Sequence, residues 1–325
     1  MGYEALMPPK GNVALSVVVP VYNGAQTIPD LVQALGRLEV PGNLEIVLVN
    51  DFSADNSLDV CRRLCERNEV ALTIVNLSRN FGEHNAVMAG LTHARGAHVI
   101  TMDDDLQNPP HEVVRLWRHA VDNGHDVVYT YSAQRQYSPW RNFGSRVANW
   151  WADRVLEKPK GLYLSTFRCM SAFTVKQVIE HTGPFPYIDG LILQVTQSIG
   201  TLEMEHLPRA AGQSNYTFRR LLRLFSSIIL NFSVMPLRVA SAIGFVLATF
   251  GALGVIMVVV EAVIWGTPRG WASLMAATLL LAGVQLIMLG LMGEYLGRLF
   301  LTVNKKPQFV IRDVQRNERA DREAQ

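Results

Sequence analysis

Three adjacent aspartates, Asp103, Asp104 and Asp105, are the side chains in this sequence best suited to chemistry. Residues two apart on an extended segment face the same side, so Asp103 and Asp105 can converge on one cation. Gln107 could add a third oxygen. Magnesium and manganese prefer oxygen ligands and often bind one or two carboxylates together with substrate phosphates. The run therefore predicts a Mg²⁺ or Mn²⁺ site that neutralises a diphosphate leaving group.

The alternative for this run is a loop of solvated aspartates, with Asn108 capping a helix that starts at Pro109. Three adjacent aspartates at the end of a strand are costly without a counterion, which favours the metal site. The net charge of +2 is too small to indicate a nucleic acid partner. Cys61, Cys65 and Cys169 form an odd set without zinc-like partners and are expected to be reduced thiols.

The elements that must position these residues follow from four apolar segments spaced like the strands of βα units, residues 15–19, 44–49, 71–77 and 98–102. Amphipathic, helix-like sequence alternates with them, and a helix at 112–123 precedes a fifth strand at 126–131. This alternation predicts an α/β fold with a parallel sheet covered by helices on both faces. Ligands of such sheets bind at the carboxyl ends of the strands. Polar segments occupy those ends here, at residues 22–23, 51–53, 78–80 and 103–107.

The last third of the chain has a different composition. Residues 240–264 contain one charge, Glu261, and residues 271–293 contain none. Each stretch is long enough to cross a bilayer, and the tight connection between them has Trp265 and Trp271 at its ends. The pattern predicts a transmembrane helical hairpin, and the alternative is a pair of buried core helices. Basic residues flank the hairpin outside the short loop, so both ends and the large domain are expected to be cytoplasmic.

The predicted organisation is a domain at residues 1–215, a juxtamembrane amphipathic helix at 216–238, the hairpin at 239–296 and a cytoplasmic tail at 297–325. Apolar stripes beside arginines occur within residues 218–229 and again within 141–154. Basic amphipathic helices of this kind suit the surface of an anionic membrane. Each stretch could instead pack on the core of the domain.

Four motifs, at residues 16–23, 50–55, 79–82 and 103–110, resemble those of inverting family 2 glycosyltransferases. The resemblance is strongest to the polyprenyl-phosphate branch, and it runs from about residue 15 to 310 with the hairpin and residues 293–298 included. It implies a GT-A fold, a Rossmann-like nucleotide-diphospho-sugar transferase domain, followed by amphipathic interface helices and a two-helix transmembrane hairpin. Each motif is weak alone, but together and in order they are highly specific.

The resemblance also implies roles for individual residues. The nucleotide-sugar site would contain Pro20, Tyr22, Asn23, Asp51, Asn80 and Asp104, together with a phosphate-contacting loop that carries Arg209, Gly212 and Ser214. The metal and diphosphate would be held by Asp103, Asp105 and Gln107. The lipid phosphate would be held by Arg141 and Ser145, with Arg135 assisting. Arginine and hydroxyl groups suit phosphate oxygens, although a single arginine here could be an ordinary surface charge.

Two positions depart from the family pattern. Asn50 replaces the first acid of the usual pair after the second strand, while Asp51 keeps the second. Leu162 stands where many relatives have an aspartate that serves as a base or orients the acceptor. Asp189 is our candidate for a substitute that contacts the sugar or assists the base role, and the alternative is a structural turn aspartate. A phosphate nucleophile is largely dianionic at neutral pH, so it barely needs a base.

The resulting hypothesis is an enzyme of the bacterial inner membrane that transfers a sugar from a nucleotide-diphosphate carrier to polyprenyl phosphate, with Asp103, Asp105 and Asp189 as its catalytic carboxylates. One alternative is a family 2 transferase with another acceptor, although the Gln-x-x-Arg-Trp signature of polymerases is absent from the sequence. Another is a membrane scaffold or flippase partner built on a weakened transferase domain. A homo-oligomer is possible, and the sequence does not identify the sugar or the nucleotide.

Overall fold

The computed structural model describes residues 13–131, 159, 162–204, 235–265, 270–317 and 319. The chain forms two compact units. One unit is Met1–Tyr216 together with Lys305–Gln325, and the other is Thr217–Asn304. The first unit therefore takes its residues from both sides of the second.

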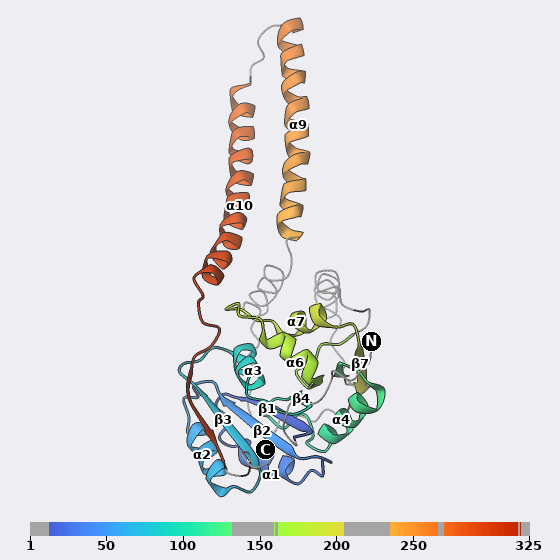
Figure 1. Ribbon diagram of the computed structural model, residues 1–325. Helices are drawn as coiled ribbons and strands as arrows, with labels where there is room; N and C mark the ends of the chain where they lie inside the picture. The colour runs from blue at the N-terminus through green and yellow to red at the C-terminus, as the bar shows by residue number, and fades with distance from the viewer. Residues whose placement is uncertain are drawn as a thin grey trace. The chain divides into compact units, whose positions relative to one another are not determined.

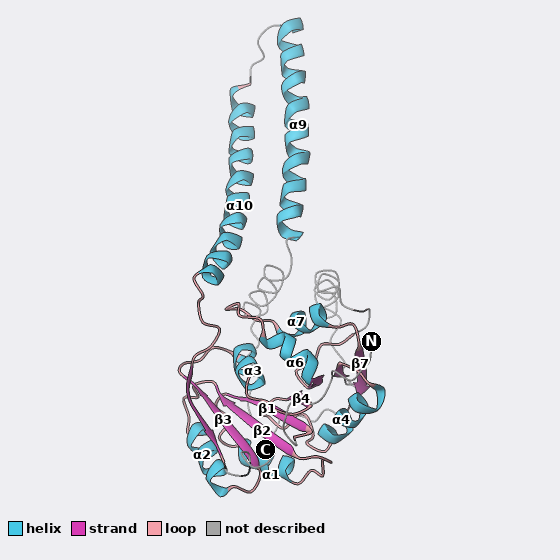
Figure 2. Cartoon of the chain, viewed as in Figure 1, coloured by secondary structure: helices cyan, strands magenta, loops and turns pink. Residues whose placement is uncertain are grey.

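The described residues contain eight strands, which form one mixed sheet in the order β7-β5-β6-β4-β1-β2-β3-β8. Figures 1 and 2 show its central strands β4, β1, β2 and β3. The bounds of the strands are β1 Leu15–Val21, β2 Leu44–Asn50, β3 Ala71–Leu77, β4 His98–Thr101, β5 Val127–Tyr131, β6 Arg168–Ser171, β7 Ile199–Glu203 and β8 Ile311–Arg316. Strands β3, β2, β1 and β4 are parallel, as the alternation of segments predicts. The outer strands make the sheet mixed, because β6 is antiparallel to β4 and β5, and β8 is antiparallel to β3. Antiparallel neighbours need no helical crossover, so the βα alternation did not predict them.

Helices cover both faces of the sheet. They are α1 Ile28–Gly36, α2 Ser57–Arg67, α3 Glu83–Leu91, α4 Glu112–Asn123, α6 Ala172–Ile179 and α7 Ile188–Val195. Apolar residues of α1, α2 and α4 pack with inward-facing residues of β1 and β2 in one core cluster. Helix α3 packs on β1, β2 and β3 from the opposite side of the sheet (Figure 1). The local signals are ordinary ones, since Ser171 caps α6 by accepting from the Thr174 amide and Gly124 ends α4 in a left-handed conformation.

Strand β8 comes from the segment that the sequence predicts to be only a tail. Beyond its pairing with β3, Asn317 accepts a hydrogen bond from the amide of Leu72 at 3.1 Å and donates to the carbonyl of Val70 at 2.6 Å. The strand has six residues in which exposed and half-buried positions alternate. Such a short edge strand carries too weak a periodic signal to be identified from sequence.

The second unit contains the predicted hairpin. Helix α9 spans Met235–Trp265 and helix α10 spans Trp271–Val303, and the two contact each other. Of the described helices, one segment, Leu281–Val303, is long and apolar enough to cross a membrane, and a shorter apolar stretch is Val239–Gly251. Large apolar side chains on both helices are exposed, with Phe245 at 76% and Ile287 at 74%. Contiguous exposed apolar surface of this kind is typical of a membrane or protein contact.

Candidate functional site

The parallel strands bring the predicted polar segments to one edge of the sheet. Val21 of β1 pairs with Asn50 of β2, and Asn50 pairs with Asn76 of β3. On the other side of β1, Val18 pairs with Thr101 of β4. Because these strands run in one direction, the loops that follow them leave the sheet at the same edge. The loops carrying Tyr22, Asp51, Asn80 and the aspartate run are therefore neighbours.

Asp51 fastens the loop after β3. Its carboxylate accepts hydrogen bonds from the backbone amides of Phe81 and Gly82, at 2.7 and 2.8 Å. Burial raises the pKa of Asp51, and the two amide hydrogen bonds oppose this rise. The structure thus shows a role for Asp51 in holding the loop, whereas its contact with a nucleotide base stays a prediction.

Asn23 joins the loops after β1 and β2. Its amide oxygen accepts from the backbone of Ala54 at 2.8 Å, and its own backbone N–H donates to the Ser53 hydroxyl at 3.1 Å. Non-glycine residues have positive φ in three of the edge loops, at Asn23 (57°), Phe52 (56°) and Leu106 (58°). Backbone strain of this type costs about 1–3 kcal/mol per residue and clusters at functional sites.

The surface of these loops offers aromatic rings. Tyr22 is 54% exposed and Phe52 is 49% exposed, although both are large and apolar. Exposed rings at a ligand-binding edge suit stacking against a planar base. Asn80 is also exposed, in the loop after β3.

The three aspartates have different surroundings. Asp103 accepts a hydrogen bond from the Thr166 hydroxyl at 2.9 Å, and Asp105 accepts one from the backbone N–H of Gln107 at 3.1 Å. Asp104 packs against the loop after β1, where a Cβ added at Gly24 would clash with its Oδ2. Burial, reinforced by repulsion from the other two aspartates, raises the pKa of Asp104 to about 7.

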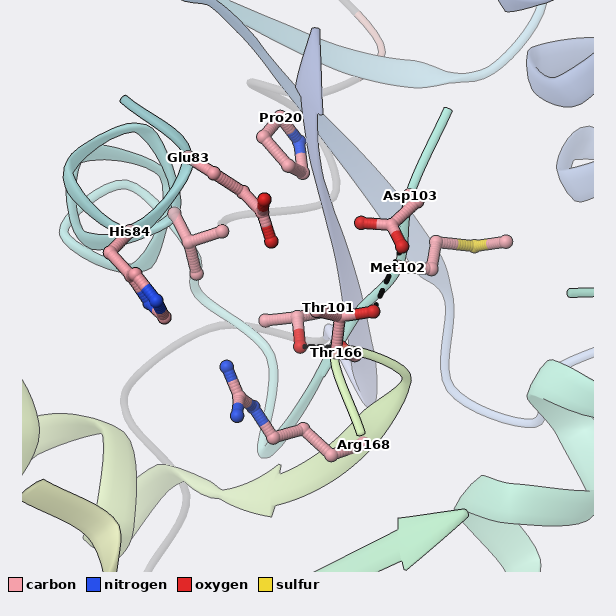
Figure 3. Close-up of a pocket in the computed structure, with 9 residues that line it drawn as sticks. Pro20, Glu83, His84, Thr101, Met102, Asp103, Thr166 and Arg168 are labelled. Carbon is pink, nitrogen blue, oxygen red and sulfur yellow. Dashed lines mark hydrogen bonds between the residues drawn. The ribbon is translucent and has the colours of Figure 1, made fainter. Parts of the chain in front are cut away.

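A pocket opens beside Asp103 (Figure 3). Its lining comes from β1, α3, the end of β4 with the loop after it, and the start of β6 with the loop before it. The lining residues are Pro20, Glu83, His84, Val87, Thr101, Met102, Asp103, Thr166 and Arg168. Figure 3 shows the carboxylates of Glu83 and Asp103 and the guanidinium of Arg168 around this space. Burial lowers the pKa of His84, so its imidazole is neutral at pH 7.

Arg168 is the buried cation of this pocket. It forms an ion pair with Asp189, and the hydroxyl of Tyr129 donates to the same carboxylate at 3.0 Å. Burial opposes the charge of Arg168, but the attraction of Asp189 outweighs it, and the pKa of Arg168 is raised. The Arg168 Nε has no hydrogen-bond partner among the described residues. Asp189 itself is not part of the pocket lining, so its contact with a sugar stays a prediction.

Sequence reasoning missed Glu83, His84, Thr166 and Arg168. One signal for Arg168 was present, since it is a single charge in the apolar run 167–170, where a buried arginine needs a carboxylate. Leu162, at the family's aspartate position, is 6% exposed. It contributes no polar group, so the carboxylates of the described pocket lining are those of Asp103 and Glu83.

Several predicted residues lie outside the described part of the chain. They are Arg135, Arg141, Ser145, Arg209, Gly212 and Ser214, together with residues 141–154 and 216–234 of the predicted amphipathic segments. Their roles stay predictions.

The described donor set fits a divalent cation that shares its coordination with a substrate. No group of three or more His, Cys, Asp or Glu side chains suited to a metal occurs in the described residues. A nearby cation would reduce the repulsion among the three aspartates. It would also interact with the buried Asp104 Oδ2, which has no hydrogen-bond partner among the described residues. Two carboxylates completed by diphosphate oxygens are a common arrangement for Mg²⁺.

Two known protein families match this chain, one over the α/β domain and one over the C-terminal hairpin. The family described as "Glycosyl transferase family 2" matches residues 16–180, and the one described as "GtrB C-terminal hairpin" matches residues 235–299. The undecaprenyl-phosphate 4-deoxy-4-formamido-L-arabinose transferase of Pseudomonas fluorescens is 35% identical over 94% of this chain and 91% of its own. The enzyme of the same name from Serratia proteamaculans is 34% identical over 92% and 93%.

Among solved structures, glucosyl-3-phosphoglycerate synthase of Mycobacterium tuberculosis is similar with a TM-score of 0.48 and 16% identity, over 67% of this chain and 78% of its own. TarS 1-349 of S. aureus is similar with a TM-score of 0.46 and 20% identity, over 68% and 67%. The family matches and the near full-length relatives confirm the resemblance and the GT-A fold. The chain therefore belongs to glycosyltransferase family 2 and is a glycosyltransferase with a GT-A domain and a C-terminal hairpin of the GtrB type.

Proposed function

We propose that this enzyme transfers a sugar from a nucleotide-diphosphate carrier to a polyprenyl phosphate, with undecaprenyl phosphate as the bacterial acceptor. The main support is the near full-length similarity to transferases named for undecaprenyl phosphate, which extends through the hairpin. The catalytic domain then lies on the cytoplasmic side of the inner membrane, and α9 and α10 cross it. The product feeds glycosylation of the cell envelope.

The donor binds at the carboxyl edge of the sheet. The nucleotide lies over the loops after β1, β2 and β3, where Tyr22 and Phe52 expose their rings and Asp51, Asn23 and Ser53 hold the backbone. Pro20 and Asn80 border this site, and Asp104 supports it from beneath. The loop with Arg209, Gly212 and Ser214 completes the contacts to the diphosphate.

The diphosphate lies beside the aspartate run. Asp103, Asp105 and Gln107 would hold Mg²⁺ or Mn²⁺, which supplies positive charge to the leaving diphosphate. The Thr166 hydroxyl orients the carboxylate of Asp103, since it donates to Oδ2. Arg168 adds a fixed buried cation on the other side of the pocket.

The acceptor phosphate attacks the anomeric carbon directly. An oxygen of the lipid phosphate forms the new bond while the bond from the anomeric carbon to the diphosphate oxygen breaks, so the configuration inverts. A phosphate monoester is largely dianionic at pH 7, which explains how Leu162 can replace a carboxylate. Arg141 and Ser145, with Arg135, hold and orient the lipid phosphate, and Asp189 acts by fixing Arg168.

The test is transfer in membranes that contain the full chain. Undecaprenyl phosphate is supplied with a panel of radiolabelled nucleotide sugars, including a 4-deoxy-4-formamido-L-arabinose donor, and the lipid fraction is counted with Mg²⁺ or EDTA. Asp103→Ala is expected to lower transfer at least about 100-fold, as loss of a transition-state charge contact does. Asp122→Asn, which changes an exposed carboxylate on α4, is the matched control.

Two results would overturn parts of the proposal. Full transfer by Asp103→Ala would exclude the metal site. Transfer to a water-soluble acceptor, with no labelled lipid from any donor, would exclude the polyprenyl phosphate acceptor and support the other-acceptor alternative.

A further inference from the structure

A chain of hydrogen bonds connects the C-terminal strand to the loop after β2. Asp313 of β8 accepts from the Asn76 side-chain amide at 2.7 Å, and the Asn50 amide donates to the Asn76 oxygen at 2.9 Å. The Asn50 oxygen accepts from the Ser53 backbone N–H at 3.3 Å. The hydroxyl of Ser53 in turn accepts from the Asn23 backbone. We call the side chains of Asp313, Asn76 and Asn50 the relay.

The relay has a fixed direction. A carboxylate only accepts hydrogen bonds, so Asn76 must turn its NH₂ group toward Asp313 and its oxygen toward Asn50. Asn50 must then donate to Asn76, which leaves its oxygen for the Ser53 amide. Asn50 and Asn76 are 3% and 4% exposed, so little water can replace a lost partner. The orientation of two buried amides therefore follows from the acceptor at position 313.

Asp313 reaches this place only because β8 pairs with the edge strand β3, where Asp313 is opposite Asn76. Its other oxygen forms an ion pair with Arg62 of α2 at 3.4 Å. Both side chains of that pair are about 40% exposed, so it contributes little. The contact that matters to the sheet edge is the one with Asn76.

We propose that Asp313 is a positioning residue for donor binding, which acts through Asn76 and Asn50 to hold the loop at Asp51–Ser53. The proposal rests on the proposed donor site at this edge. It also assigns a role to the amide of Asn50, which donates to Asn76 and accepts from the Ser53 backbone. If position 50 carried a carboxylate, Asn76 would lie between two carboxylates. Its NH₂ group can be directed toward only one of them, so the other would face the Asn76 oxygen.

The test reverses the direction of the hydrogen bonds in the relay. Asn50→Asp is expected to weaken uridine diphosphate binding about tenfold, the effect of one unsatisfied buried group. Asp313→Asn keeps an acceptor for Asn76 and is expected to weaken binding only about two- to threefold, because the bond loses its charge assistance. In the double variant, the new amide at position 313 can donate to Asn76, and Asn76 can donate to the new carboxylate at position 50. That carboxylate still accepts from the Ser53 backbone, so the double variant is expected to bind more tightly than Asn50→Asp alone.

Three controls separate the relay from other effects. Asn50→Asp with Asp313→Ala removes the same charge but offers no donor, so it is expected not to restore binding. Arg62→Ala removes the exposed ion pair, and Arg312→Ala removes an exposed side chain next to Asp313 on β8 without loosening the strand pairing. Neither is expected to change the dissociation constant more than twofold. Binding is measured by calorimetry on the full chain in detergent, and the donor KM and kcat are compared, since positioning of the donor should change KM more than kcat.

Recovery of binding in the double variant, without recovery in Asn50→Asp with Asp313→Ala, supports the relay. Equal loss of binding in the double variant and in Asn50→Asp, or equal loss in Arg312→Ala, overturns the relay while the proposed function stands. If the wild-type chain bound no uridine diphosphate and turned over no nucleotide sugar, the proposed donor site would fail and the positioning role with it.

Discussion

Arg168 and Asp189 form a buried ion pair, one on the first residue of β6 and the other in α7. The side chains are 3% and 11% exposed, and Tyr129 donates to the same carboxylate. Two charges leave water at considerable cost, and good geometry with additional hydrogen bonds is needed to offset it. Arg168 lines the pocket beside Asp103. The ion pair thus holds a cation where we expect the diphosphate of the donor, which is a functional reason for burying two charges.

Removing one partner of this pair is expected to be severe. Asp189→Asn leaves the buried Arg168 without a counter-charge, and we expect a loss of about 3–5 kcal/mol in the free energy of unfolding. The double variant Arg168→Met with Asp189→Leu is expected to recover much of the stability, because no charge stays buried. Thermal unfolding measures both.

The same variants show whether the Arg168–Asp189 pair only stabilises the fold or also supports sugar transfer. Transfer is expected to stay low in the double variant although its stability returns. Arg118→Ala, which removes an exposed side chain from α4, is the control and should change stability by less than about 1 kcal/mol. Recovery of transfer together with stability would show that the ion pair is only structural.

Thr166 orients the Asp103 carboxylate through one hydroxyl. Thr166→Val keeps the shape of the side chain and removes this donor, so we expect the Mg²⁺ concentration for half-maximal transfer to rise about 10-fold or more, as for other residues that orient metal ligands. Thr92→Val removes a hydroxyl that donates to the Ala89 carbonyl at the far end of α3, and it is the control. An unchanged Mg²⁺ requirement in Thr166→Val would contradict the assignment.

Gly82 holds a backbone conformation that side chains disfavour, with φ of 90°, while its amide donates to Asp51. No atom of the described residues lies within 4 Å of a Cβ added there, so Gly82→Ala introduces backbone strain of about 1–3 kcal/mol without a clash with them. We expect lower donor affinity, because the loop after β3 loses its contact with Asp51. Gly124→Ala imposes left-handed backbone strain at the end of α4 (φ 62°, ψ 32°) and is expected to lower stability but leave the donor KM unchanged. Equal donor affinity in both variants would exclude a role for the Gly82 conformation.

The cysteines are expected to be unreactive in the folded enzyme. Cys61, Cys65 and Cys169 are all buried, and burial raises the pKa of Cys61 to about 12 and of Cys65 to about 11. Because only the thiolate reacts, and it is scarce at pH 8 when the pKa is raised, a thiol reagent should label none of them before unfolding and all three afterwards. Rapid labelling of any one in the native protein would contradict the buried positions.

The sequence by itself determined the family, the order of the first strands and helices, and the clustering of polar residues at one sheet edge. These features depend on local periodicity and on motifs of consecutive residues, which a linear chain displays directly. The run Asp103–Asp105 could be assigned a site because parallel strands that alternate with helices end at a common edge.

Only the tertiary structure decided how distant residues combine. The pocket joins Glu83 of α3 to Arg168 of β6, and Asp313 returns from beyond the hairpin to bond to Asn76. Neither pairing has a local signal, since a hydrogen bond between residues 237 positions apart depends on the order of strands in the sheet. Asp189 is a second example. The sequence suggested that this carboxylate lies near the reaction, but its partner Arg168 could be identified only from the position of β6 between β4 and β5 in the folded sheet. Burial then fixes the state of each group, because a charge that leaves water must find its partner in the folded chain.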